Sequence, residues 1–175
     1  MKALKIILLV IVFLAAFFFI GGMLLPKTYQ VKRSISINAP DSVVYNNIAD
    51  FNNFLKWNPW YKMEPSARIK IAGTAGQPGH LYTWEGEETG TGQMLIKNIV
   101  PQKLVDIELK FIKPFENTAK TKFQLDAKEN TTVVTWIMEG ENKSSMDRWM
   151  GLGMDSMIGG DFESGLKELK SLSEK

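Results

Sequence analysis

The sequence predicts an α+β protein, in which one N-terminal transmembrane helix precedes an antiparallel sheet that is covered by a long C-terminal helix. Three observations predict this class. Residues 6–25 carry no charge. Several segments between residues 29 and 139 alternate apolar and polar side chains, as half-buried strands do. Residues 154–172 instead place apolar side chains at spacings of three and four, as in a helix with one buried face.

The apolar run IILLVIVFLAAFFFIGGMLL (residues 6–25) is 20 residues long. A helix of that length rises roughly 30 Å, the hydrocarbon thickness of a bilayer. A cleavable signal peptide is the alternative, but its apolar region is usually about 7 to 15 residues long and ends at a small-x-small site. This run is longer and closes with Met23, Leu24, Leu25 and Pro26. We therefore expect a retained anchor (residues 1–26) and a folded domain (residues 27–175).

Positive charges flank the apolar run almost equally, with Lys2 and Lys5 before it and Lys27, Lys32 and Arg33 after it. We expect a single-pass membrane protein with its N-terminus inside and its domain on the extracytoplasmic side. About four residues separate the run from the first strand, and an extended chain covers about 3.4 Å per residue. The domain should therefore sit on the membrane surface, with the lipid bilayer as a partner through residues 6–25.

The composition argues against several kinds of site. The 21 basic and 19 acidic residues are interspersed and give a net charge of +2, unlike the basic face of a nucleic-acid-binding protein. The chain has no cysteine, which excludes disulfides and thiolate ligands. A single histidine cannot build a zinc site by itself, and GTAGQPG (residues 73–79) lacks the Lys and Ser or Thr of a P-loop. We expect no nucleic-acid partner, no metal and no cofactor.

The elements of the domain follow in order. A strand is expected at residues 29–37, and Pro40 begins a helix whose apolar side chains recur at helical spacing: Val44, Ile48 and Phe51. Further strands are expected at residues 68–72, 80–85, 93–100, 103–112, 118–127 and 131–139. Short turns join them, which favours hairpins and a meander. The terminal helix should cover one face of the sheet with a stripe formed by Met154, Ile158, Phe162, Gly165, Leu169 and Leu172.

Six segments in this order resemble the SRPBCC or START-like superfamily, in its polyketide cyclase and dehydrase branch: WNPWYKMEP, GHLYTWEG, GTGQM, FIKPF, TVVTW and DSMIGGDFESGLKELK. The resemblance covers about residues 29–172 and leaves out the apolar run. It implies a helix-grip fold, in which a curved antiparallel sheet wraps a long C-terminal helix around an elongated cavity. Members of the superfamily bind lipids, sterols, polyketides and other hydrophobic molecules, and a minority are enzymes. Because one fold supports many functions, the resemblance does not choose a reaction.

Side chains expected to face such a cavity form the candidate ligand-binding site: His80, Tyr82, Trp84, Met94, Ile107, Leu109, Phe111, Phe123, Trp136, Met138, Met154, Met157, Ile158, Asp161 and Phe162. Among the other aromatic residues, Trp57, Trp60 and Trp149 suit a cavity rim or a membrane interface as well as a core.

Two of these residues are catalytic candidates. His80 could act as a general base, although a histidine beside a glycine turn at a strand start is more often structural. Asp161 falls inside the apolar arc of the terminal helix, where a lone carboxylate is unfavourable unless it is paired. It could orient a polar group of a ligand, bond a backbone amide, or pair with Arg68 or Lys97. The carboxylates that flank Gly86 are expected to be solvated: Glu85, Glu87 and Glu88.

Four of the nine methionines lie between Met146 and Met157, interspersed with glycines. Methionine adapts to apolar ligands of different shape, and each glycine weakens a helix by about 1 kcal/mol relative to alanine. One interpretation is a movable wall, or gate, over an apolar cavity. The other is a methionine-filled core that follows a loop.

These observations predict a membrane-anchored binding module that holds a hydrophobic or lipid-like small molecule in an internal cavity. The alternative is a cyclase, dehydratase or hydrolase that uses the same cavity, with His80 or Asp161 as acid or base. A third possibility is an anchored interaction domain, which should have a filled interior. Binding is favoured over catalysis because few polar side chains are expected in the cavity.

Overall fold

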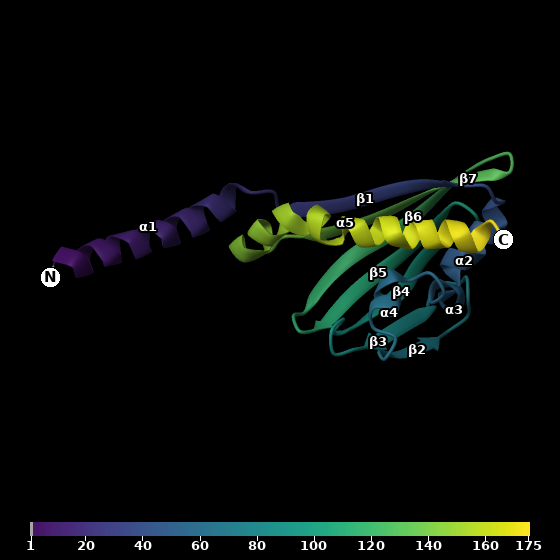
Figure 1. Ribbon diagram of the computed structural model, residues 1–175, viewed down its shortest axis with the longest axis horizontal. Helices are drawn as coiled ribbons and strands as arrows, with labels where there is room; N and C mark the ends of the chain where they lie inside the picture. Colours follow the sequence, from purple (N-terminus) through teal and green to yellow (C-terminus); the bar gives the residue numbers. More distant parts are fainter. Residues whose placement is uncertain (1) are drawn as a thin grey trace.

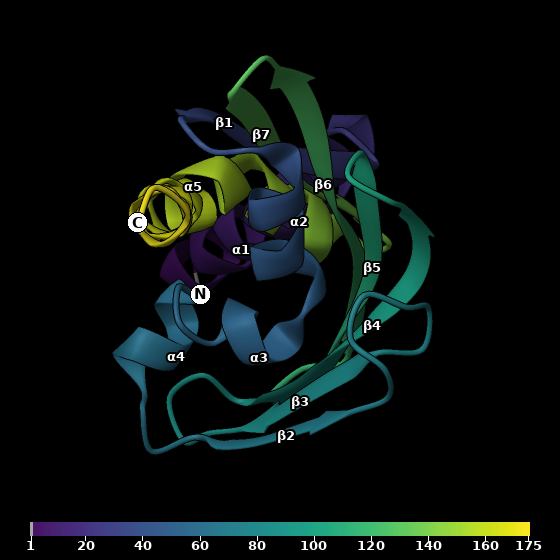
Figure 2. The ribbon, with the colours of Figure 1, turned by 90° about the vertical axis from the view of Figure 1, so that its right-hand side faces the viewer.

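A long N-terminal helix, α1 (Lys2–Leu24), projects from a domain in which one seven-stranded sheet curves around the other helices (Figures 1 and 2). This computed structural model describes residues 2–175. The strands are β1 (Thr28–Ile37), β2 (Arg68–Ala72), β3 (Leu81–Glu85), β4 (Thr91–Val100), β5 (Leu104–Lys113), β6 (Asn117–Lys128) and β7 (Thr131–Glu141). The helices of the domain are α2 (Asp41–Ala49), α3 (Phe51–Phe54), α4 (Pro59–Met63) and α5 (Ser145–Ser173).

The strands pair in the order β1-β7-β6-β5-β4-β3-β2, and every pair is antiparallel. Strands β2 to β7 form the predicted meander, whereas β1 extends the sheet by pairing with β7, so that Tyr29 lies opposite Gly140. The curved sheet is thus an open barrel with β1 and β2 at its two edges. This pairing joins the beginning of the domain to its end, and α5 then packs against β1. The predicted fold, a curved antiparallel sheet around a long C-terminal helix, is confirmed.

The segment between the first strand and β2 contains more helix than the sequence suggested. The expected single helix breaks at Asp50, whose carboxylate accepts a bond from the Asn52 amide (2.9 Å) and so begins α3. The turn-rich segment after it contains α4, in which Asn58 caps the first turn by accepting a bond from the Trp60 amide (3.0 Å). Proline at the first helical position loses no hydrogen bond there. Each of these helices is only about one turn long, so its capping signal was too short to predict a helix from the sequence.

Helix α5 is continuous from Ser145 to Ser173 despite its glycines. It begins with a capping box, in which the Asp147 amide donates to Ser144 Oγ (3.1 Å) and the Ser144 amide donates to Asp147 Oδ2 (2.8 Å). The bond from the Ser144 backbone holds the pKa of Asp147 below its ordinary value. Arg33 of β1 then binds two carboxylates along the helix, Asp155 (2.7 Å) and Glu163 (2.8 Å).

At several glycines of α5, neighbouring groups approach the helix so closely that a side chain would not fit. At Gly165 an added Cβ would lie 3.0 Å from Trp136 Cζ3, and at Gly159 it would meet the guanidinium of Arg33. Next to Gly165, Phe162 stacks on Trp136 with ring centroids 4.0 Å apart, and Leu166 and Leu169 are fully buried. The glycines therefore allow close approach of neighbouring groups, and the second half of α5 carries the predicted core-facing stripe.

The N-terminal helix is attached to the domain through α5 as well as through the chain. Arg148 Nη1 donates to the carbonyls of Gly22 (3.2 Å) and Met23 (2.8 Å), and the Trp149 indole donates to the Phe18 carbonyl (3.0 Å). A Cβ on Gly22 would lie 2.6 Å from Ser145 Cβ, so a glycine is needed at this contact. The two helices meet at a defined joint.

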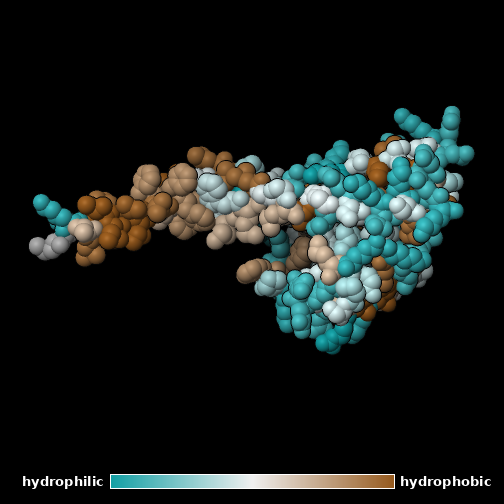
Figure 3. All heavy atoms as spheres, in the orientation of Figure 1, coloured by the Kyte–Doolittle hydropathy of each residue, from teal (hydrophilic) through white to brown (hydrophobic). Residues whose placement is uncertain are grey.

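Apolar side chains cover α1, in contrast to the mainly hydrophilic surface of the domain (Figure 3). Among residues 2–175, α1 is the one helix that is long and apolar enough to cross a bilayer. A signal sequence near an N-terminus has the same character.

Candidate ligand-binding cavity

A cavity of about 440 Å³ lies between the concave face of the sheet and helices α4 and α5. Most of the residues predicted to face a cavity do line it: Tyr82, Trp84, Met94, Leu109, Phe111, Trp136, Met138, Met154, Ile158, Asp161 and Phe162. Helical and strand periodicity located these side chains because alternate strand residues share a face and every third or fourth helical residue shares a side.

The cavity occupies the end of the barrel that lies next to α1. Strand β1 begins at this end, and antiparallel pairing places the end of β3, the end of β5 and the beginning of β6 at the same edge. The lining residues of these strands lie close to that edge: Tyr29, Trp84, Phe111 and Asn117. The opposite end of the barrel is filled by side chains from α2, α3 and the strands. The hollow space is therefore confined to the half of the domain next to the N-terminal helix.

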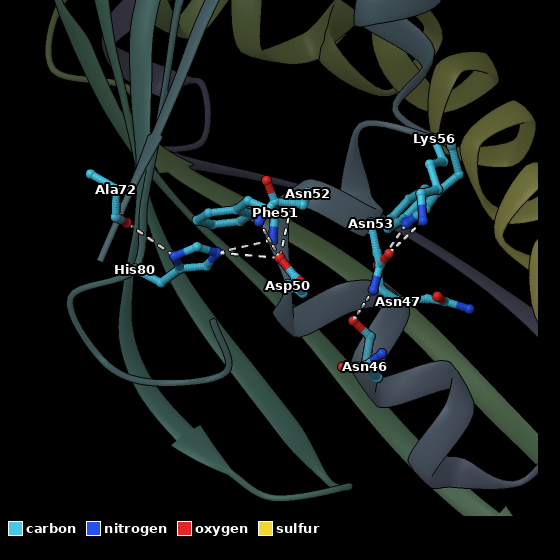
Figure 4. A network of polar contacts seen from close by, with 10 residues as sticks. Asn46, Asn47, Asp50, Phe51, Asn52, Asn53, Lys56, Ala72 and His80 are labelled. Carbon is cyan, nitrogen blue, oxygen red and sulfur yellow. Dashed lines mark hydrogen bonds and ion pairs between the residues drawn. The ribbon is translucent and has the colours of Figure 1, made fainter. Parts of the chain in front are cut away.

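His80 lies in the filled half and does not line the cavity. Its Nε2 accepts a bond from the Phe51 amide (3.0 Å), and its Nδ1 donates to the Ala72 carbonyl (3.0 Å), as Figure 4 shows. These partners assign the tautomer with the proton on Nδ1. The ring also stacks on Phe51 and is 1% exposed. Both nitrogens therefore join backbone segments, which leaves neither of them directed at a ligand.

Three further residues of the predicted site lie outside the cavity lining. Ile107 and Phe123 are buried in the core, where Phe123 packs against Trp57 and Trp136 (centroids 5.9 and 4.9 Å). Met157 of α5 is 63% exposed. Alternation gives the face of a strand but not the point along it at which packing ends and open space begins, which explains these misplacements.

The same result corrects the idea of a methionine wall. Of the four methionines in the first half of α5, Met154 lines the cavity, while Met146, Met150 and Met157 are exposed. The capping box and the Arg33 ion pairs hold this part of α5 in a regular helix. The structure therefore differs from a frayed methionine gate and from a methionine-filled core.

Sequence reasoning missed the contribution of α4 and its neighbours to the lining. Trp60, Tyr61 and Met63 of α4, with Ala67 and Ile69, close one side of the cavity. The aromatic cluster WNPWY was a usable signal, but it did not distinguish Trp60, which lines the cavity, from Trp57. The latter is fully buried and donates from its indole nitrogen to the Asn47 carbonyl (2.8 Å).

Glu64 holds one side of the cavity rim in place. Its carboxylate accepts bonds from the backbone amides of Glu87 (2.7 Å), Glu88 (3.2 Å) and Thr89 (2.8 Å), and from the Thr89 hydroxyl (2.7 Å). The bonds from Thr89 and the other amides lower the pKa of Glu64 to about 2. The loop between β3 and β4, which contributes Glu88 and Thr89 to the lining, is therefore fixed to the end of α4.

The charged side chains that line the cavity, among the described residues, are acidic. Among the described residues, those that line the cavity include two carboxylates, Asp161 and Glu88, and no Lys, Arg or His. Asp161 is half-buried and has no ion-pair partner within 4.0 Å in residues 2–175. Lys97, one of its expected partners, pairs with Glu108 (3.8 Å). Two of the other polar groups bond to each other: Asn58 donates to the Tyr82 hydroxyl (3.3 Å), and burial raises the pKa of Tyr82.

Comparison with known proteins identifies the class to which this arrangement belongs. The sequence model of the family described as polyketide cyclase/dehydrase and lipid transport matches residues 28–174. The chain therefore belongs to this family. No curated protein matches the sequence significantly.

Solved structures share the fold. Protein CV1439 from Chromobacterium violaceum has 17% sequence identity and a TM-score of 0.62, over 86% of this chain and 99% of that one. The Aha1 dimer from Colwellia psychrerythraea has 20% identity and a TM-score of 0.58, over 83% and 96%. Ara h 8.0201 has 14% identity and a TM-score of 0.55, over 82% and 99%. At these identities the likeness establishes the helix-grip architecture alone.

Proposed function

We propose that this protein is a membrane-anchored module that binds a hydrophobic small molecule in its internal cavity. The observation that carries the proposal is the cavity of about 440 Å³, which is lined largely by aromatic and aliphatic side chains. Ligand sites typically have about 300 to 1,000 Å³ and a mainly apolar lining with few polar groups. Helix α1 (Lys2–Leu24) would be the anchor, and the domain would follow it on the extracytoplasmic side of a single-pass protein.

The charge of the lining favours one class of ligand. An amphiphile with a neutral or positively charged head could place that head near Asp161, whereas an anionic head would meet Asp161 and Glu88 with no cationic side chain in the lining to offset them. Like charges in a partly desolvated site repel strongly. The proposed ligand is therefore an apolar molecule with a hydrogen-bond donor or a cationic group.

Titration of the full chain in detergent micelles with three probes of equal tail length tests this function: dodecylamine, dodecanol and dodecanoate. We expect the amine and the alcohol to bind about tenfold or more tightly than the acid. Asp161→Asn should reduce the preference for the amine, because it removes the charge and keeps the shape. Asp126→Asn, which makes the same change on an exposed part of β6, is the matched control.

A substitution that fills the cavity tests whether the probes bind inside it. Ala67 is half-buried in the lining, and Ala67→Phe should reduce binding of every probe about tenfold, whereas Ala75→Phe, in an exposed loop, should not. Equal binding by both variants would contradict an internal site. Mass spectrometry of molecules extracted from the purified protein would identify the natural ligand, and finding no apolar molecule and no probe binding would overturn the function.

The enzymatic alternative depends on Asp161, since His80 is bonded to two backbone groups. A carboxylate at a cavity wall could act as a general acid or base. Once the extracted ligand is known, its chemical change by the native protein and the absence of that change with Asp161→Asn would favour catalysis over binding.

A further inference from the structure

The N-terminal segment of α5 (residues 145–157) presents an unusual set of exposed apolar side chains. Met146, Met150, Leu152 and Met157 are between 50% and 63% exposed. The three methionines are four and seven residues apart, so they lie along one side of the helix. Isolated exposed apolar residues need no explanation, but a contiguous group on a protein surface indicates an interaction site.

The position of this segment indicates what covers it. It runs beside the end of α1 (Figure 1), where Trp149 donates to the Phe18 carbonyl and packs against the Phe17 and Phe18 rings. Phe18 precedes the end of the apolar run by seven residues, which is about 10 Å along a helix. With α1 upright across a bilayer about 30 Å thick, Trp149 would lie up to about 10 Å below the boundary between headgroups and acyl chains, in the same leaflet. Interfacial helices bury their apolar faces to about 5–10 Å.

Most polar groups at the start of this segment have protein partners, although the buried Nε of Arg148 has none. The capping box of Ser144 and Asp147 takes up free amide groups at the start of α5. Arg148 donates to the carbonyls of Gly22 and Met23 in the last turn of α1, where carbonyls lack intrahelical partners. The Gly22 carbonyl also accepts a bond from the Leu25 amide (3.3 Å). A cation is also favourable at the C-terminal end of a helix. Placing this joint at a membrane interface therefore leaves few unpaired polar groups.

The cavity lies at the same end of the domain. Met154 and Ile158, on the flank of the same helix, line the cavity, and the lining residues of the strands lie at the edge next to α1. The loop between β5 and β6 projects from this edge (Figure 1) and carries Phe115, which is 80% exposed. An exposed aromatic side chain thus lies at this end of the domain in addition to the methionines of α5.

We propose that residues 145–157 of α5 lie in the interface of the lipid leaflet beside α1 and, with Phe115, hold the mouth of the cavity against the bilayer. A hydrophobic ligand then passes between leaflet and cavity without crossing water. The proposal rests on the proposed function, both for the membrane-spanning role of α1 and for the ligand.

Single-cysteine variants of the full chain test the location, because the native sequence has no cysteine. Met150→Cys and Met157→Cys would carry a fluorescent label in phosphatidylcholine vesicles, with Asn130→Cys in the turn between β6 and β7, at the far end of the domain, as control. We expect lipid-borne spin labels to quench positions 150 and 157 several-fold more than position 130, and aqueous iodide to show the reverse order. Equal iodide quenching at all three positions would overturn the proposal. Protection from both quenchers would also overturn it, because a protein surface would then cover the segment.

A transfer assay tests the consequence for the ligand. Met150→Asp with Met157→Asp should slow transfer of a fluorescent dodecylamine from vesicles about tenfold and leave its affinity in detergent unchanged, whereas Ser156→Asp should change neither. Unchanged transfer by a variant that binds the probe would contradict membrane docking. If the native protein does not bind the probe in detergent, the proposed function is contradicted. The quenching result would still decide where residues 145–157 lie.

Discussion

The two ends of the barrel are built from the same strands, yet one is filled and the other is hollow. At the end away from α1, short helices insert large side chains: Phe51 of α3 stacks on His80 (4.7 Å) and packs against Phe54 (6.0 Å), whose ring borders the cavity. At the end next to α1, α4 and the first half of α5 stand apart and enclose the cavity. The difference shows that the helices, which plug or bridge the open side of the curved sheet, determine where a helix-grip domain is hollow.

The largest effect that should separate the two ends is that of His80→Ala. Removing the ring leaves the Phe51 amide and the Ala72 carbonyl without their partners in a buried site. Each orphaned buried group costs about 1–3 kcal/mol, so we expect the free energy of unfolding to fall by about 2–5 kcal/mol in chemical denaturation. Probe affinity of the folded protein should remain unchanged. A stable variant that no longer binds would place His80 in the ligand site after all.

A matched pair of substitutions on β5 should sharpen the comparison. Ile107 is buried in packed core, whereas Leu109, two residues along on the same face, lines the cavity. Ile107→Ala should lower the free energy of unfolding by about 3–4 kcal/mol, because it adds a new cavity to the loss of apolar burial. Leu109→Ala should cost about 2 kcal/mol, since its side chain already borders open space and only the transfer contribution is lost. Equal costs would mean that the two ends are packed alike.

The smallest effect should appear at the cavity rim as a dependence on pH. Folding lowers the pKa of Glu64 from 4.5 to about 2, so its bonds to the β3–β4 loop stabilise the protein fully above about pH 4.5. This contribution is lost as the pH falls through about 2. Glu64→Gln should therefore increase amide hydrogen exchange at Glu87 and Thr89 several-fold at pH 7, and the difference from the native protein should narrow below pH 4.5. A difference that stays constant with pH would show that the charge of Glu64 does not hold the rim.

The sequence could predict the elements of this fold because each one has a local cause. Alternation in β5 to β7 and the three-and-four spacing of Phe162, Gly165 and Leu169 follow from the geometry of strands and helices, and each pattern extends over many residues. The pairing of β1 with β7 had no such signal, since it joins residues that are about a hundred positions apart, such as Ser34 and Thr135. Helix α4 was missed because a single turn carries too few residues to show a period.

The candidate site likewise combines features that local patterns predict with features that depend on distant segments. Periodicity indicated that Leu109, Trp136 and Phe162 face inward, and the uncharged length of residues 6–25 predicted a helix able to cross a bilayer. Tertiary packing alone decided that His80 is bonded to two backbone groups, that Phe123 lies in solid core, and that three methionines of α5 are exposed. A local pattern fixes which face a side chain occupies, but whether that face meets protein, empty space or lipid depends on segments that are distant in the chain.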